Sequence, residues 1–266
     1  MGRKDKNKNK NKISGSVKTA LKTEKKLNAK QKKELTALGE EDIEKVITEI
    51  EKEEARRQRV KEMIVNPPSR RVNFTLTAHP FKNELIMLGG EFYDGRQTIV
   101  YGDMFSYNIN KQEWTLIKAP GAPPPRCGHQ TVATTANGTG ELWVFGGEFT
   151  SPSESQFYHY RDLWVFRFAE KKWEKIISAV ANDRREKCFP SPRMNAGMVM
   201  KYNVLYLYGG LVEEDDRQYT LCDFYSLDCR KLDEWKILRL DDLSSQTWFD
   251  SSEENEDEED ICNEEQ

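Results

Sequence analysis

Short apolar runs alternate with clusters of glycine, proline, asparagine and aspartate over residues 67–240 of the chain. Runs of four to six residues rich in β-branched and aromatic side chains, bounded by turn-forming residues, are typical of β-strands. In the middle of this region they predict four strands, at residues 130–134, 142–145, 163–168 and 173–177. The pattern therefore predicts an all-β protein built from short antiparallel strands.

Three of the apolar runs end in a glycine pair, and each pair begins the same series of marks. An aspartate follows the second glycine after 13, 15 and 13 residues, and a large apolar residue lies four positions beyond it. A tryptophan follows the aspartate after 11, 11 and 12 residues. Recurrence of a four-stranded unit at this spacing is typical of β-propeller blades. The marks are Gly89, Gly90, Gly146, Gly147, Gly209 and Gly210, then Asp103, Asp162 and Asp223, then Tyr107, Phe166 and Leu227, and finally Trp114, Trp173 and Trp235.

This series resembles the kelch repeat, whose features are the double glycine, a downstream aromatic residue and a tryptophan at fixed spacing. The resemblance implies a kelch-type β-propeller with blades at residues 67–120, 121–178 and 190–240. Family members have additional blades between the last two of these, so we interpret the chain as a shortened form joined near residues 178–190. Because propellers close with about four to eight blades, three are expected to form an open, incomplete ring that self-associates.

The repeat marks are expected to be structural. The glycines allow sharp turns and close strand approach, and the large side chains are expected to pack between adjacent blades. Arginines near a proline before each glycine pair, Arg70, Arg126 and Arg193, are expected to bond backbone carbonyl groups between blades. A phosphate-binding loop is the disfavoured alternative, because neither a helix nor an adjacent lysine follows the glycines.

Residues 40–66, before the repeats, carry apolar side chains at helical spacing, with acidic residues in the first turn where the helix dipole favours them. We expect one charged amphipathic helix that ends at Pro67 and either packs weakly or pairs with a partner. The stripe is short for a coiled coil. Its first apolar positions are Ile43, Val46, Ile47 and Ile50.

The ends of the chain are oppositely charged, although the net charge is only −4. Residues 1–33 hold 13 basic and two acidic residues, whereas residues 241–266 hold 12 acidic and no basic ones. Residues 1–39 and 241–266 are expected to be disordered. The basic end is interpreted as an import signal, a weak contact for RNA or an acidic protein, or a solubilising tail. In the acidic end, Ser251 is expected to be a phosphorylation site, because Glu254 follows it.

Composition and motifs narrow the function classes. The sequence contains no run of 18 or more apolar residues, so a membrane-spanning helix is not expected. The five cysteines contain no CxxC pair and are typical of reduced thiols inside the cell, in the nucleus or the cytoplasm. Only three histidines are present, and no hydrolase, metalloprotease or nucleotide-binding motif occurs. We therefore expect no enzyme activity, no cofactor and no metal.

The connections between the second and third strands of each repeat are the candidate binding surface. Because strands alternate in direction, these connections share one face, and tyrosine and arginine dominate interface hot spots. The leading hypothesis is a non-enzymatic scaffold that binds an unidentified protein. The alternatives are a substrate receptor of a ubiquitin ligase, an RNA- or ribosome-assembly-associated factor, and aromatic residues that only fix their own loops. The candidate residues are Tyr93, Arg96, Tyr101, Phe157, Tyr158, Tyr160, Arg217 and Tyr219.

Overall fold

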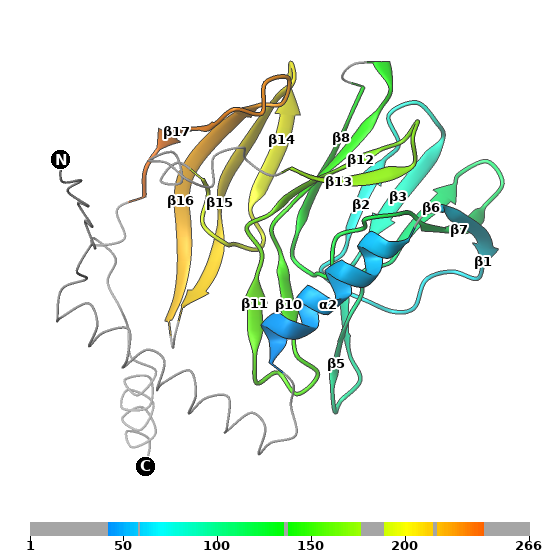
Figure 1. Cartoon of the computed structure of the whole chain (residues 1–266), viewed down its shortest axis with the longest axis horizontal. Helices are drawn as coiled ribbons and strands as arrows, with labels where there is room; N and C mark the ends of the chain where they lie inside the picture. The colour runs from blue at the N-terminus through cyan, green and yellow to red at the C-terminus, as the bar shows by residue number, and fades with distance from the viewer. Residues whose placement is uncertain (1–41, 58, 136–137, 177–188, 215–216, 242–266) are drawn as a thin grey trace, which may run out of the picture.

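The computed structural model describes residues 42–57, 59–135, 138–176, 189–214 and 217–241 (Figure 1). Three antiparallel sheets stand side by side, and the helix α2 (Ile43–Arg56) lies across the first two. The mostly β, open kelch-type architecture predicted from the repeats is thus confirmed. The two charged ends, except Asp241, lie outside the described residues, as do most of the join near residues 178–190 and Ser251. Asp241 accepts a hydrogen bond from the Cys222 N–H at 2.7 Å.

Each sheet is one blade of four consecutive repeat strands, with the first strand at the inner edge. The inner strands of the three blades lie next to one another. Blade 1 consists of β2 (Thr75–Ala78), β3 (Glu84–Leu88), β6 (Met104–Asn108) and β7 (Glu113–Lys118). Blade 2 consists of β8 (Gln130–Thr134), β9 (Glu141–Phe145), β12 (Leu163–Arg167) and β13 (Lys172–Ile176), which confirms the four predicted strands. Blade 3 consists of β14 (Gly197–Lys201), β15 (Val204–Glu214), β16 (Arg217–Asp228) and β17 (Trp235–Arg239).

The segment before the repeats differs from the single helix predicted for residues 40–66. The helix ends at Arg56, and β1 (Lys61–Val65) instead pairs antiparallel with β7 as a fifth strand of blade 1. The outer edge of β7 offers a row of unpaired backbone groups, and pairing with β1 satisfies them. This tertiary partner outweighs the helical spacing of the apolar residues in that segment.

The connections predicted as binding loops are short two-stranded ribbons in this structure. Blade 1 carries β4 (Glu91–Tyr93) paired with β5 (Thr98–Val100), and blade 2 carries β10 (Glu148–Thr150) paired with β11 (Phe157–His159). In blade 3 the ribbon is continuous with β15 and β16, through the pairs Gly210–Leu221 to Glu214–Arg217. All three ribbons project from the same end of the blades (Figure 1).

Alternation along the strands of blade 2 gives this sheet two apolar faces, one for each neighbouring blade. The face toward blade 1 and the face toward blade 3 each form a separate buried cluster. Burial of one large apolar side chain contributes about 1.5–3 kcal/mol, so these clusters hold the blades together. Toward blade 1 lie Leu142, Val144, Trp164, Phe166 and Trp173. Toward blade 3 lie Trp143, Phe145, Leu163 and Val165, which meet Leu205, Leu207, Tyr225, Leu227 and Trp235.

The aromatic repeat marks of blade 1 do not pack between two blades as predicted. Tyr107 and Trp114 pack on each other with ring centroids 4.9 Å apart, and both are half-buried. They are cross-strand partners on the face of blade 1 that points away from blade 2. The prediction holds for Phe166, Trp173, Leu227 and Trp235, because among the described residues only their blades follow another blade.

Helix α2 packs its apolar stripe on this chain rather than on a separate partner. Ile43 and Ile47 are only 9% and 4% exposed. The Asp42 carboxylate accepts a hydrogen bond from the Glu44 N–H and caps the helix, and Glu51 forms an ion pair of 2.9 Å with Lys175 of blade 2. The helix thereby ties the first two blades together on one side.

One arginine in each repeat organises the start of its blade. The Arg126 guanidinium is 1% exposed and donates to the Gly146 carbonyl at 3.0 Å and to both carboxylate oxygens of Asp162 at 2.7 and 3.1 Å. Arg193 makes the same bonds to the Gly209 carbonyl and to Asp223. We call each arginine, aspartate and first glycine together a node. A bidentate, charge-assisted pair of this kind fixes both distance and orientation.

The node of blade 1 corrects a prediction about which arginine acts there. Arg71, not the exposed Arg70, donates to the Gly89 carbonyl at 3.1 Å and pairs with Asp103. The arginine side chains were expected to bond carbonyl groups between blades, but each one bonds the glycine carbonyl of its own blade. It is the backbone carbonyl of Arg126 that reaches the preceding blade, where it accepts from the Gly90 N–H at 2.9 Å.

The glycine pair of blade 2 is required because a backbone carbonyl of the next blade touches its first glycine and one of the same blade touches its second. Gly146 and Gly147 have φ of +66° and +93°, which favour residues without a Cβ. A Cβ on Gly146 would lie 2.5 Å from the Arg193 carbonyl oxygen, and one on Gly147 would lie 2.6 Å from the Cys127 carbonyl oxygen. The predicted structural role of the glycines thus has a direct steric cause.

Burial and ion pairing compete at the node of blade 2. Burial alone would raise the pKa of Asp162, but the adjacent Arg126 guanidinium outweighs this effect and the pKa is lowered. Both partners therefore stay charged at neutral pH. Replacement of Arg126 by alanine is expected to lower the free energy of unfolding by about 3–5 kcal/mol, because it leaves a buried carboxylate unpaired.

Urea unfolding of R126A measures this loss, and R70A is the matched control. Arg70 is exposed, so its replacement is expected to change the free energy of unfolding by less than about 0.5 kcal/mol. Equal stability of R126A and R70A would contradict the role given to the node.

Between the inner strands of blades 1 and 2, His129 is 1% exposed and bonds the Thr75 hydroxyl at 3.0 Å. Burial, with a contribution from Arg126, lowers the pKa of His129 to about 3. The unfolded chain, with a pKa of about 6.5, therefore binds a proton that the folded chain excludes. The contribution of His129 to the free energy of unfolding is fully present above pH 6.5. It falls by about 1.4 kcal/mol per pH unit as the pH decreases from 6.5 toward 3.

Urea unfolding at pH 7.5, 6 and 5 is expected to show this decline, and H129Q should show a smaller slope with pH. The comparison of slopes separates His129 from carboxylates, which titrate equally in both proteins. An unchanged slope in H129Q would show that His129 does not exclude a proton.

Candidate functional site

The candidate binding surface is built on the ribbons of blades 1 and 2, which are joined to each other. The Thr98 N–H of β5 donates to the Pro152 carbonyl at 3.0 Å, and the Thr98 hydroxyl donates to the Glu154 carboxylate. At the far side, the first N–H of α2, on Ile43, donates to the Gln156 side chain at 3.3 Å. These bonds hold the two ribbons and the helix as one surface rather than as independent loops.

Several of the predicted residues are exposed on this surface. Tyr93 on the first ribbon is 57% exposed, and Phe157 on the second is 48% exposed. Arg96, three residues after Tyr93, is also exposed. The Asp94 carboxylate accepts from the N–H groups of Gln97 and Arg96, and these bonds lower the pKa of Asp94. The turn that carries Arg96 is therefore fixed by its own backbone.

Two of the predicted binding residues belong to the nodes instead. The Tyr160 ring lies 4.0 Å from the Arg126 guanidinium carbon, and its hydroxyl donates to the Pro125 carbonyl at 3.0 Å. Tyr160 is only 3% exposed, and burial raises its pKa, so it has no surface left for a partner. Tyr101 stacks on Arg71 in the same way, at 3.8 Å. Both tyrosines lie two residues before the aspartate of their node, and this position places their rings over the arginine instead of in solvent.

The other predicted residues are placed between these extremes. Tyr158 is half-buried against Tyr160, with ring centroids 5.0 Å apart, and burial raises its pKa. Arg217 is exposed and Tyr219 is half-buried on the ribbon of blade 3. Ile99, which the sequence did not single out, is 37% exposed, but it pairs with Phe92 and lies on the opposite side of the first ribbon from Tyr93. We call the exposed members of the predicted set, Tyr93, Arg96, Phe157 and Arg217, the ribbon face.

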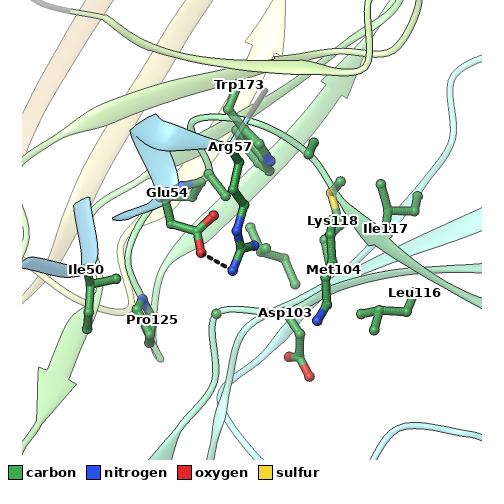
Figure 2. A pocket seen from close by; sticks show the side chains of 15 residues that line it. Ile50, Glu54, Arg57, Asp103, Met104, Leu116, Ile117, Lys118, Pro125 and Trp173 are labelled. Atoms are coloured by element: carbon green, nitrogen blue, oxygen red, sulfur yellow. Dashed lines mark ion pairs between the residues drawn. The ribbon is translucent and has the colours of Figure 1, made fainter. Parts of the chain in front are cut away.

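A cavity of about 250 Å³ lies beneath α2, at the junction of blades 1 and 2 (Figure 2). Its walls are largely apolar, and the Glu54 carboxylate at its rim is paired with Arg57 at 2.8 Å. Burial raises the pKa of Glu54. The cavity is lined by Ile50, Leu88, Met104, Ile117, Pro125 and Trp173, among others, and these residues supply packing rather than reactive groups.

The cysteine thiols of the described residues are poor nucleophiles. Burial raises the pKa of Cys127, and it raises that of Cys229 to about 12. A thiol with a raised pKa carries little thiolate at neutral pH. His79 accepts from the N–H groups of Phe81 and Lys82 through Nδ1, and burial lowers its pKa. These groups stabilise local structure.

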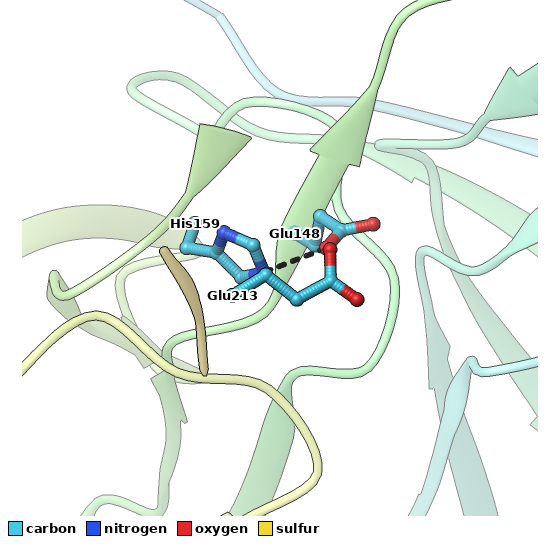
Figure 3. A group of neighbouring side chains, drawn as sticks. All are labelled: Glu148, His159 and Glu213. Atoms are coloured by element: carbon cyan, nitrogen blue, oxygen red, sulfur yellow. Dashed lines mark ion pairs between the residues drawn. The ribbon is translucent and has the colours of Figure 1, made fainter. Parts of the chain in front are cut away.

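The structure also brings together three side chains that the sequence analysis did not connect. Glu148 and His159 are cross-strand partners on the second ribbon, and Glu213 approaches from the ribbon of blade 3 (Figure 3). Their ligand atoms all lie within 4.8 Å of one another. No spacing could have predicted this group, because Glu213 lies in a different repeat.

Among the described residues, none of the helices combines the length and apolar character needed to cross a bilayer.

Comparison with known proteins matches residues 39–246 to a family model described as the KLHDC2/KLHL20/DRC7 Kelch-repeats domain. Similar proteins include Mei4-dependent protein 6 of Schizosaccharomyces pombe, 26% identical over 152 residues, or 56% of this chain and 20% of that protein. Putative protein tag-53 of Caenorhabditis elegans is 32% identical over 93 residues, or 34% of this chain and 6% of that protein. The flagellar outer arm dynein alpha chain of Chlamydomonas reinhardtii is 25% identical over 183 residues, or 65% of this chain and 4% of that protein.

The chain therefore spans a fifth or less of the length of these relatives. The family model, in contrast, covers more than half of the chain and includes all three glycine pairs and their nodes. On this match, and on the three blades that the structure describes, the chain belongs to the kelch-repeat family.

Proposed function

We propose that the chain is a non-enzymatic protein-interaction scaffold that binds a partner protein through the ribbon face. The kelch-repeat domain is in general a protein-interaction fold. The observation that supports the proposal most is the exposure of Tyr93 and Phe157 on two ribbons that are hydrogen-bonded to each other. Aromatic and arginine side chains on a rigid support lose little entropy on binding, and they dominate interface hot spots.

We further infer a position within the family. The lysine-rich start and the acidic end around the repeats are similar to those of kelch domain-containing protein 4, with the middle blades missing. In that interpretation residues 67–177 correspond to the first two blades and residues 190–266 to the last blade and tail. An intracellular location, in the nucleus or the cytoplasm, is part of the same proposal.

The triple variant Y93A/R96A/F157A tests the ribbon face. Loss of hot-spot residues costs about 2 kcal/mol each, so proteins captured by the tagged chain in cells should be reduced at least roughly tenfold. Quantitative mass spectrometry of captured proteins is the measurement.

The matched control removes similar side chains from the opposite end of the blades. Ile109 and Tyr202 are 48% and 84% exposed in turns away from the ribbons, and Lys111 is exposed beside the first of them. I109A/K111A/Y202A is expected to retain the captured proteins. Retention by both variants, or an equal loss in both, would refute the ribbon face as the binding surface.

We also propose that copies of this chain associate head to tail, because the two outermost blades carry the two halves of a blade–blade interface. The outward face of blade 1 has large side chains at the positions that pack against the preceding blade in blades 2 and 3. The outward face of blade 3 has them at the positions that pack against the following blade. On blade 1 these are Met87, Phe105, Tyr107 and Trp114, of which Met87 and Phe105 are already buried at 5% and 7% exposure, and on blade 3 they are Tyr206, Tyr208 and Phe224.

The backbone contacts between blades repeat in the same way. The Gly90 N–H donates to the Arg126 carbonyl, and the Gly147 N–H donates to the Arg193 carbonyl, both at 2.9 Å. The next donor in this series is the Gly210 N–H, and the first acceptor is the Arg71 carbonyl. Two copies joined through these groups supply six blades, within the range of about four to eight at which propellers close.

Sedimentation velocity over a range of concentrations tests this association. Tyr208 is 48% exposed on the outward face of blade 3, and Leu76 is 53% exposed on that of blade 1. Y208E and L76E are each expected to be monomeric, because a buried unpaired charge is costly. A mixture of the two variants should form dimers again, since one junction then joins two unaltered faces.

The matched control is Y202E, which places a charge on a turn outside both faces and should still associate. A wild-type chain that stays monomeric would refute the proposal. Association that Y208E abolishes and L76E leaves unchanged would show a symmetric contact between two copies of blade 3 instead.

A further inference from the structure

Glu148, His159 and Glu213 form a compact group between the ribbons of blades 2 and 3 (Figure 3). Glu148 begins β10 and His159 ends β11, so the two are neighbours across the ribbon. Glu213 comes from the extended part of β15. The side chains of Glu148 and His159 are each 8% exposed, whereas Glu213 is the exposed member of the group.

The contact between Glu148 and His159 has the distance of an ion pair without the direction of a hydrogen bond. Glu148 Oε2 and His159 Nε2 are 2.8 Å apart, yet neither buried atom has a hydrogen-bond partner of acceptable geometry. Glu148 is 6% exposed as a residue. A buried carboxylate oxygen without a hydrogen bond is costly unless another group satisfies it.

Two atoms that lie side by side in this way suit two ligands of one metal ion. With metal–ligand bonds of about 2.0–2.2 Å, adjacent ligand atoms lie roughly 2.8–3.5 Å apart. The 2.8 Å separation fits the lower end of this range, and the Glu213 carboxylate, within 4.8 Å of both atoms, is the third ligand available to the ion. Imidazole nitrogen and carboxylate oxygen are both ordinary ligands of divalent transition metals.

The surroundings hold Glu148 in place. The Thr150 hydroxyl donates to Glu148 Oε1 at 2.8 Å, and the Glu148 backbone exchanges two hydrogen bonds of 2.9 Å with Cys127. Such outer contacts orient a ligand for its metal. Within the described part of the chain, His159 is the basic side chain that lies within ion-pairing distance of Glu148. A divalent cation would neutralise both carboxylates of the group.

We propose that Glu148, His159 and Glu213 bind a divalent transition-metal ion, with Zn²⁺ as the probe that represents this class. The ion links the ribbons of blades 2 and 3 and keeps at least one coordination position open to water, as three-ligand sites do. This site is independent of the ribbon face proposed above, because it shares no residue with it.

Repeat symmetry provides a matched control. Glu91 follows the glycine pair of blade 1 as Glu148 follows that of blade 2, but its cross-strand partner is Val100 rather than a histidine. A glutamate directly after the glycine pair is therefore shared by two repeats and does not by itself define the site. The histidine and the third ligand distinguish the site of blade 2.

Isothermal titration of the full chain with ZnCl₂, together with thermal melts, tests the site. The wild-type chain and E91Q are expected to bind one equivalent and to melt at a higher temperature with Zn²⁺. H159Q and E213Q should lose more affinity than the roughly 10- to 100-fold that loss of an outer-shell partner costs. Absence of binding to the wild-type chain would overturn the proposal, and so would binding by H159Q and E213Q as tight as that of the wild-type chain.

The Co²⁺ spectrum of the wild-type chain gives a second result that does not depend on whether the variants fold. Ligation by nitrogen and oxygen is expected to give d–d bands without a thiolate charge-transfer band. A thiolate band at one equivalent would place the ion on cysteines and overturn the assignment to Glu148, His159 and Glu213.

Discussion

The bidentate pair between a buried arginine and an aspartate at the start of each blade is the interaction on which the rest of the structure depends. Arg126 and Asp162 lie 36 residues apart, and their side chains fix where β12 begins relative to the turn before β8. The same guanidinium binds the Gly146 carbonyl, so the glycine pair, the turn and the third strand meet at one point. Charged groups are retained in the interior here because each has a geometrically matched partner.

The node also joins one blade to the next, and this explains why the glycines are needed. The Arg193 carbonyl accepts from the Gly147 N–H and lies where a Cβ on Gly146 would be. Each blade thus presents a donor to the following blade and an acceptor to the preceding one. Among the described blades, blade 1 has no preceding blade and blade 3 has no following one, so the next donor and the first acceptor of this series belong to Gly210 and Arg71. The ribbons are extensions of the same strands, so their relative positions follow from how the nodes align the blades.

Much of the fold could be predicted from the sequence because the determining interactions are local in each repeat. The strands of blade 2 were found from alternation and turn residues, and the glycine pairs from their recurrence. The helix predicted to continue through residues 61–65 was wrong, because these residues pair with β7 instead. That contact joins residues distant in sequence, and local periodicity carries no information about it. The prediction that Arg70 bonds backbone carbonyls was wrong for a similar reason. Two adjacent arginines cannot be distinguished in the sequence, and the fold directs Arg71 to the Gly89 carbonyl.

For the site, repeat spacing is enough to show that aromatic and arginine residues gather in the second connection of each repeat, on one end of the blades. Which of these residues are available depends on the folded chain, in which Tyr93 is exposed and Tyr160 lies over the Arg126 guanidinium. The fold alone also brings Glu213 to Glu148 and His159. The physical reason is that repeat spacing encodes each blade, whereas contacts between blades arise only when the packed faces fix their mutual orientation.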